Sequence, residues 1–242
     1  MKNIILIAFS MLLFTCSNDD SDSNNNSNGN LKKTEAYFPS MDVNYSIDYK
    51  YDNIGRIESL NTQTINSSGT SNNSETYEYN SEGQIWKVIK PNGFNTEFTF
   101  SNGLIVSSMN MPNMTSTLYI YDSSDRLIKQ EIYGDDGDIN YEYDYLYDEQ
   151  NNILSREVSG NSNYIHVYEY DNNPNPYFNV YANQEIAKVL EINPNNFMNR
   201  TKSIGSSQTV YTHEYTYNSS NLPLTSKEYE NGNLVGQTAY SY

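Results

Sequence analysis

The sequence of 242 residues predicts an all-β protein, in which sequential antiparallel hairpins form one large curled sheet that is open or barrel-like. Two observations lead to this prediction. A turn-like segment recurs at residues 51–60, 79–88, 121–130 and 147–156, and tyrosines separated by one residue precede most of its copies. Between the turns, apolar and polar residues alternate with the period of two that is typical of strands. We expect about fourteen strands on this basis.

The chain begins with the layout of a secretory signal. Residues 1–15 carry one basic residue, Lys2, and an apolar run that ends before Cys16 and is too short to span a bilayer. Residues 13–16, LFTC, resemble a lipobox, which implies that Cys16 becomes the first residue of the mature chain and is acylated. An ordinary signal with an incidental cysteine is the alternative. Cys16 is the only cysteine, so no disulfide can form within the chain.

Residues 16–30 predict an acidic, disordered tether. After Cys16 this segment has no apolar residue, so it buries too little surface to offset its ordering entropy. Asp19, Asp20 and Asp22 resemble export signals that carry some Gram-negative lipoproteins to the outer face of the outer membrane. The resemblance implies a lipid-anchored outer-membrane protein on the extracellular side. A solvated spacer on a protein of the periplasmic face is the alternative.

Residues 31–242 have the length of one domain, and we expect a monomer. The chain contains 24 Tyr, 8 Phe and 1 Trp, and its formal net charge is −16. Because this charge repels phosphate groups and no basic cluster opposes it, nucleic-acid binding is excluded. The charge also disfavours peripheral binding to anionic lipid, which leaves the anchor on Cys16 as the only predicted membrane contact.

Each repeat has the residues that a tight hairpin turn requires. The residue after the tyrosine is Asp or Asn, whose side chain accepts hydrogen bonds from the backbone amides that follow it. Four positions after the tyrosine stand residues that tolerate a positive φ. These are Gly55, Gly83, Asp125, Asn151 and Asn221. Apolar residues follow the turn, namely Ile57, Ile85, Leu127 and Ile153.

The paired tyrosines share one face of their strands, because alternate residues of a strand point the same way. We expect their rings to stack across neighbouring strands. They are candidates either for stacking on a ligand or for a packed aromatic core. These candidates are Tyr49, Tyr51, Tyr77, Tyr79, Tyr119, Tyr121, Tyr145, Tyr147, Tyr168, Tyr170, Tyr215 and Tyr217.

Residues 49–57 (YKYDNIGRI) and 119–127 (YIYDSSDRL) resemble the unit of the YD-repeat (RHS-like) proteins. The resemblance extends more loosely over most of residues 45–242. It implies a long curled sheet of sequential hairpins with tyrosines packed inside, and it brings no catalytic residue. Among shorter relatives, the chain looks most like small bacterial lipoproteins of unknown function with a porin-like β-fold.

The array is interrupted near residues 172–200. Pro174 and Pro176 lack amide donors and disfavour a central strand. Ile186, Val189 and Leu190 are spaced for one face of a helix, with Asn183 as a candidate N-cap. We therefore expect a short helix or an ordered loop that lies on the sheet or plugs it.

Residues with recognisable catalytic or metal chemistry are few. His166 and His213 lie in alternating strand patterns without cysteine partners, so they indicate strand histidines rather than zinc ligands. Residues 135–140, DDGDIN, predict a hairpin turn. The alternative is a weak calcium site at Asp136, Asp138 and Asn140, although Tyr141 stands where an EF-hand loop needs glycine.

The sequence has no G-x-S-x-G elbow, no P-loop and no second cysteine, and it predicts neither an enzyme nor a cofactor. The favoured function is a non-catalytic binding or display module for a glycan or a surface protein. The alternative is a structural scaffold of the cell envelope with a self-buried tyrosine core, and a hydrolase is less favoured. We expect the sheet not to cross a membrane, because charged residues alternate with the tyrosines. These include Lys50, Glu78, Glu142, Asp144 and Glu169.

Overall fold

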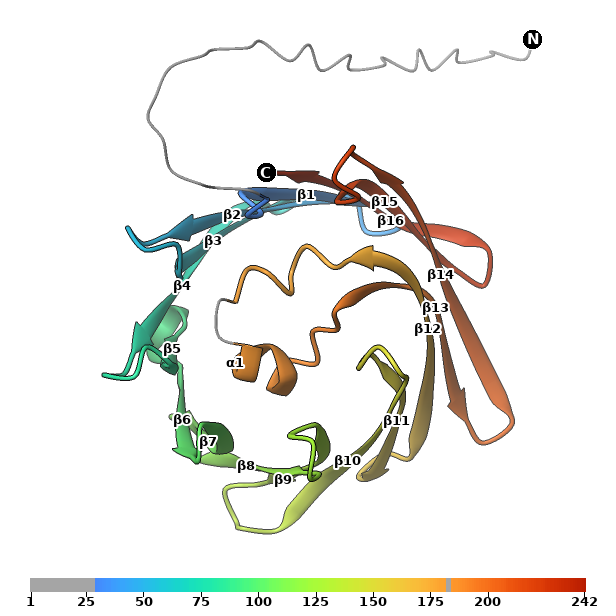
Figure 1. The fold of residues 1–242 in the computed structure, drawn as a ribbon. Helices are drawn as coiled ribbons and strands as arrows, with labels where there is room; N and C mark the ends of the chain where they lie inside the picture. Colours follow the sequence, from blue (N-terminus) through green and yellow to red (C-terminus); the bar gives the residue numbers. More distant parts are fainter. Residues whose placement is uncertain (1–28, 182–183) are drawn as a thin grey trace, which may run out of the picture.

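The computed structural model describes residues 29–181 and 184–242, in which sixteen antiparallel strands close into a barrel (Figure 1). The first eight strands are β1 (Lys33–Phe38), β2 (Val43–Tyr51), β3 (Ile57–Asn66), β4 (Gly69–Tyr79), β5 (Ile85–Ile89), β6 (Asn95–Ser101), β7 (Leu104–Met111) and β8 (Thr115–Tyr121). The others are β9 (Leu127–Tyr133), β10 (Ile139–Tyr147), β11 (Ile153–Gly160), β12 (Tyr164–Pro174), β13 (Asn195–Ile204), β14 (Ser207–Tyr217), β15 (Pro223–Glu230) and β16 (Asn233–Ser241). A 3₁₀ turn (η1, Pro91–Gly93) precedes β6, and one α-helix (α1, Gln184–Val189) lies between β12 and β13.

Every strand pairs with the next one along the chain, and β1 pairs with β16 to close the barrel. In the closing pair, Thr34 lies opposite Tyr240. The predicted all-β fold of sequential hairpins is confirmed, and of the two forms left open the sheet takes the closed one. The estimate of about fourteen strands was too low. One reason is that β1 lies ahead of the first tyrosine pair and carries no such pair itself.

The repeated turns form as predicted. Asp52 Oδ1 accepts hydrogen bonds from the amides of Ile54 and Arg56 at 3.0 and 2.9 Å, and Gly55 has a φ of +86°. Asp125, Asn151 and Asn221 occupy the same left-handed position, with φ between 58° and 65°. The first turn is also braced by an ion pair between Arg56 Nη2 and Asp52 Oδ2 at 2.8 Å. We call the end of the barrel that carries these turns the turn end.

The tyrosine face of the strands points into the barrel. Ile57, Ile85, Ile105 and Leu127, each the first or second residue of its strand after a turn, are fully buried with 0% exposure. The expected stacking of tyrosines across neighbouring strands is largely absent from the ring contacts of the described residues. Their tyrosine–tyrosine contacts run mostly along one strand, as between Tyr168 and Tyr170. The tyrosine-bearing strands alternate with strands that lack the pair, so the paired rings lie two strand spacings apart, about 10 Å.

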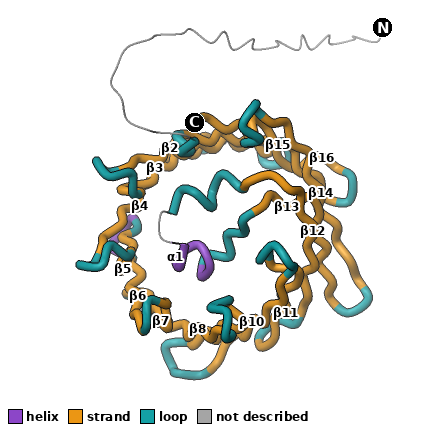
Figure 2. The backbone as a smooth tube through the Cα atoms, viewed as in Figure 1, coloured by secondary structure: helices purple, strands orange, loops and turns teal. Residues whose placement is uncertain are grey.

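The interrupted segment enters the barrel rather than lying on its surface (Figures 1 and 2). We call residues 175–181 and 184–194 the plug. Its helix α1 buries Ile186 and Ala187 completely and Val189 almost completely. Leu190, predicted to share a helical face with Ile186 and Val189, lies directly after the last residue of α1 and is 46% exposed. The predicted N-cap, Asn183, lies outside the described residues, as do the predicted signal (1–15), Cys16 and nearly all of the tether.

No helix in residues 29–181 and 184–242 is long and apolar enough to cross a membrane.

Candidate functional site

The second tyrosine of each pair is fixed by the barrel itself. Its hydroxyl donates to a backbone carbonyl of the preceding hairpin, at 2.6 Å from Tyr79 to Ile57 and at 2.6 Å from Tyr147 to Leu127. The remaining members of this set do the same with other acceptors, namely Tyr51 to Leu31, Tyr121 to Ile105, Tyr170 to Ile153, and Tyr217 to the Asp171 carboxylate. Since both ring and hydroxyl are engaged, this set forms a structural ladder around the inner wall.

The first tyrosine of each pair lies deeper in the barrel and is also engaged. Tyr119 and Ser108 share a hydrogen bond of 2.9 Å, and Tyr145 donates to Glu191 of the plug at 2.7 Å. The other four bond to the chain as well: Tyr49 with Thr34, Tyr77 with Tyr181, Tyr168 with His166, and Tyr215 with the Phe197 carbonyl. Burial raises the pKa of Tyr168 to about 12. Of the two roles considered for the twelve tyrosines, the geometry supports the packed core.

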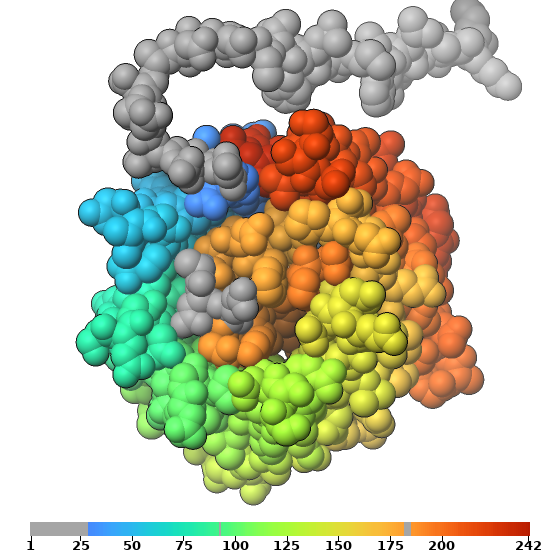
Figure 3. Space-filling view, in the orientation of Figure 1, coloured from blue at the N-terminus to red at the C-terminus, as the bar shows by residue number. Residues whose placement is uncertain are grey.

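The plug is tied to the barrel by a polar network around Glu191. Its carboxylate accepts the Tyr145 hydroxyl and pairs with Arg156 Nη1 at 2.5 Å. Arg156 in turn contacts His166 Nδ1 through Nη2 at 3.1 Å. On the other side of the plug, a cavity of about 240 Å³ separates α1 from the inner face of β4–β8. Figure 3 looks onto the turn end, where the plug fills most of the mouth of the barrel.

A cluster of inward-facing basic side chains lies on one wall of the lumen. We call Arg156, His166, Arg200, Lys202 and His213 the basic wall. They lie on the adjacent strands β11 to β14, where Arg156 pairs with His166 and His166 with Lys202. Arg200 pairs with Tyr168 on one side and Tyr211 on the other, so it shares their inward face.

Both histidines of the chain belong to this wall and are buried, with exposures of 7% and 9%. Burial, with Arg156, Arg200 and Lys202 nearby, lowers the pKa of His166 to about 4. Burial and Arg200 lower the pKa of His213 to about 4. Both imidazoles are therefore neutral at pH 7.

The acidic groups next to the basic wall are Glu228 and Glu230 on β15. Glu228 lies 3.8 Å from Arg200 and 3.9 Å from His213, and its burial raises its pKa. The Tyr211 hydroxyl donates to Glu230 at 3.4 Å. The basic wall thus combines hydrogen-bond donors, cations, two carboxylates and aromatic rings on one inner surface.

The weak calcium candidates form a hairpin turn between β9 and β10. Asp136 Oδ1 accepts the Asp138 amide at 3.1 Å, and Gly137 has a φ of +84°. Asn140 bonds to Asn161 of the neighbouring hairpin loop instead. Within the part of the chain that the structure describes, no group of three His, Cys, Asp or Glu residues is placed to hold a metal ion.

Comparisons with known proteins show the fold of this chain. No protein-family model matches the sequence, and no curated protein matches it significantly. Among the solved structures that are similar, two are described as porin-like proteins. The one from Bacteroides uniformis is 13% identical with a TM-score of 0.65, and the match covers 87% of this chain and 97% of that one. The one from Bacteroides vulgatus is 15% identical with a TM-score of 0.58, and the match covers 88% and 98%. The protein therefore has a porin-like β-barrel fold.

Proposed function

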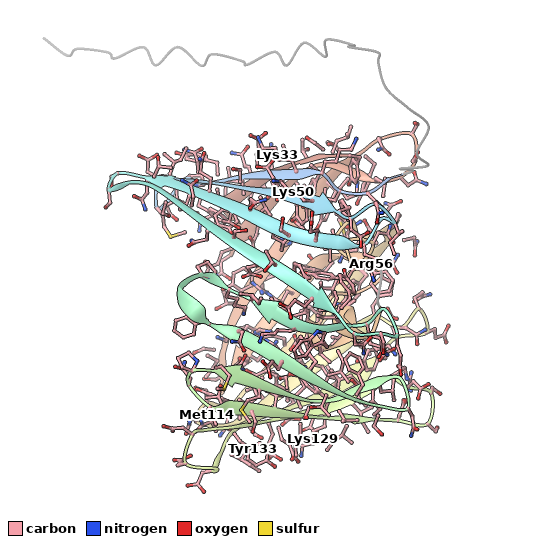
Figure 4. All side chains as sticks on the ribbon, turned by 90° about the vertical axis from the view of Figure 1, so that its left-hand side faces the viewer. Lys33, Lys50, Arg56, Met114, Lys129 and Tyr133 are labelled. Atoms are coloured by element: carbon pink, nitrogen blue, oxygen red, sulfur yellow. The ribbon has the colours of Figure 1, made fainter. Side chains whose placement is uncertain are left out.

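We propose that this protein is a non-catalytic module of the cell envelope, a barrel that stands in water on a lipid anchor and displays a binding surface for a glycan or a protein. The observation that carries the proposal is the charge on the outer side of the strands. Lys129 and Glu142 form an outward ion pair of 2.7 Å, and Asp144 follows on the same face. Lys33, Lys50 and Lys129 lie on the outer side of the barrel (Figure 4).

These outer charges are incompatible with a lipid-facing surface. A transmembrane barrel presents an apolar band to lipid, and a Lys or Arg at the bilayer midplane costs about 2–4 kcal/mol. Lys87 and Glu97 form a further outward pair of 2.8 Å, on β5 and β6. The pairs lie in the middle of their strands, where the hydrocarbon core would be. The charged outer face of the strands therefore requires water, while the tyrosines pack inside the barrel.

The point at which the N-terminal residues join the barrel supports one orientation of the barrel relative to the membrane. The Leu31 carbonyl accepts the Tyr51 hydroxyl beside the first repeated turn, so the described N-terminal residues join the barrel at its turn end. An anchor on Cys16 would therefore attach at the plugged end, and the opposite mouth would face away from the membrane. Arg56 and Met114 mark these two ends in Figure 4. The outer membrane with extracellular display remains the proposed location, and its periplasmic face the alternative.

The repeated turns support the YD-repeat resemblance, which we retain as a proposal. The arginine of the repeat stacks on a tyrosine of the next unit, with the Arg56 guanidinium 4.0 Å from the centre of the Tyr79 ring. A second candidate function is a purely structural scaffold. It is favoured by the twelve tyrosines, whose hydroxyls all have partners within the chain.

The variant Cys16→Ser in the full chain distinguishes a barrel that is held by a lipid anchor from a barrel that spans the membrane. In a Gram-negative host, we expect the unaltered protein in the detergent-extractable membrane fraction. The variant should appear in the detergent-free fraction with a β-rich circular dichroism spectrum. If the variant still needs detergent to leave the membrane, the barrel itself is inserted and the proposal is wrong.

A further inference from the structure

The basic wall holds buried nitrogen atoms that the chain does not satisfy. Arg156 Nε, His166 Nε2, Arg200 Nε and His213 Nδ1 have no hydrogen-bond partner among the residues that the structure describes. Leaving a buried polar atom unpaired costs about 1–3 kcal/mol, so native proteins rarely collect several in one place. Their convergence on one inner surface indicates a site for an external partner.

At least three of these atoms are donors. The Nε of an arginine always carries a hydrogen. His166 Nδ1 faces Arg156 Nη2 at 3.1 Å, and because an arginine can only donate, Nδ1 is the acceptor. The neutral imidazole therefore carries its hydrogen on Nε2, the unpartnered atom. The missing partner must supply acceptor oxygens.

Charge at the wall favours an anionic acceptor. The Lys202 ammonium lies 4.5 Å from the centre of the Tyr164 ring and forms no ion pair within the described residues. The carboxylate nearest to Arg200, that of Glu228, is 3.8 Å away, at the limit for an ion pair. Lys202 stands two residues from the end of β13, at the mouth opposite the turn end, so a ligand can approach it from outside.

The neighbouring carboxylates and rings narrow the class of anion. Glu228 and Glu230 lie beside the cations, so a polyanion or a phosphate dianion would be repelled. The same carboxylates accept hydrogen bonds from hydroxyl groups. Tyr164 and Tyr211 are half-buried, and each is covered by a cation, Lys202 and Arg200 respectively, within 4.5 Å of its ring centre. A tyrosine ring can pack on the apolar face of a sugar while its hydroxyl bonds to it.

We propose that the basic wall binds a sugar that carries a single carboxylate, a uronic acid. The carboxylate lies against Lys202, His166 Nε2 and Arg200, and the sugar hydroxyls face Glu228 and Glu230. The assignment rests on the display function proposed above, for which it names the ligand class. It is tested on purified protein, so its failure and that of the membrane anchor are seen in different experiments.

The test is titration calorimetry of the full chain at low ionic strength with D-glucuronate, D-glucose and inorganic phosphate. We expect glucuronate to bind at least tenfold more tightly than either of the other two. Lys202→Gln should weaken glucuronate binding about tenfold or more, which is a loss of about 1.4 kcal/mol. The matched control is Lys227→Gln, which removes the same charge from the outer face of β15, opposite Glu214. It should change the affinity less than twofold.

A second readout does not depend on the stability of any variant. The chain has only two histidines, and both lie in the basic wall, so their ring protons report on the site directly by NMR. Glucuronate should shift both signals, and glucose should not. Undetectable glucuronate binding, unshifted histidine signals or equal weakening by Lys227→Gln would each overturn the site. Phosphate binding as tight as that of glucuronate would overturn the sugar assignment.

Discussion

The hydroxyl ladder predicts opposite effects at two equivalent positions, Tyr147 and Phe100. Tyr147 pairs with Ile153 at a repeated turn and donates to the Leu127 carbonyl at 2.6 Å. Tyr147→Phe removes only the hydroxyl, so the packing of the ring is kept. A neutral hydrogen bond of this kind contributes about 1 kcal/mol, which for a chain of this length lowers the melting midpoint by roughly 2–4 °C.

Phe100 occupies the same place in its own unit, since it pairs with Ile105 after the turn. A hydroxyl added at this ring would reach for the Ile85 carbonyl, by analogy with Tyr121 and Ile105. Phe100→Tyr should therefore raise the free energy of unfolding by up to about 1 kcal/mol. A gain from an added polar atom in a buried site is unusual, and it is what makes this pair of variants informative.

Urea unfolding followed by the fluorescence of the single tryptophan, Trp86, measures both changes. The midpoint should fall for Tyr147→Phe and rise for Phe100→Tyr while the slope stays constant. Tyr37→Phe is the control, because its hydroxyl bond to Asp42 is exposed and should contribute little. If Tyr147→Phe matches the control, or if Phe100→Tyr destabilises the protein, the ladder does not contribute as we describe.

Three further predictions concern the turns, the pH dependence and the plug. Gly55 has a φ of +86°, and a Cβ there would meet no atom within 4 Å, so the cost of a side chain comes from the backbone conformation alone. Gly55→Val should lower the free energy of unfolding by about 1 kcal/mol or more, and Gly55→Asn by less. Equal, negligible shifts of the urea midpoint would contradict this. The pKa values of about 4 for His166 and His213 lie below the unfolded value of 6.5, so their contribution is complete above pH 6.5 and is lost as pH falls toward 4. His213→Gln should flatten the fall of the melting midpoint over that interval. Glu191→Gln breaks the ion pair with Arg156 and should cost roughly 2 kcal/mol, with faster hydrogen exchange in α1; unchanged exchange would refute the role of this pair.

The turns and the tyrosine face could be predicted from sequence because their causes are local. An Asp or Asn after the tyrosine and a residue tolerant of positive φ four positions on define the turn with no knowledge of the rest of the chain. Closure depends instead on the pairing of the two ends. Thr34 pairs with Tyr240, more than two hundred residues away, and no sequence feature near either residue indicates this pairing.

The basic wall escaped prediction for a related reason. Lysine and arginine in an alternating strand normally mark the solvated face, and Arg156 and Lys202 were not distinguished from the outward Lys50 and Lys129. A usable signal was present on β12, where His166 has the same parity as Tyr164 and Tyr168 and must share their face. On β13 the parity could not be carried over, because the plug separates that strand from the preceding repeats.

The strands on either side of the plug hold most of the buried side-chain atoms that lack a hydrogen-bond partner among the described residues. In the regular unit at Tyr79, the tyrosine hydroxyl donates to the Ile57 carbonyl and the Arg56 guanidinium covers the ring. The strands that flank the plug carry His166 and Arg200 at inward positions, and both keep an unpaired nitrogen. Stability alone would favour an apolar or fully hydrogen-bonded side chain there, since a buried unpaired donor is costly. Departures of this kind from local consistency are expected where function is the compensating gain. Mutagenesis should therefore begin with β12–β14 rather than with the repeated turns.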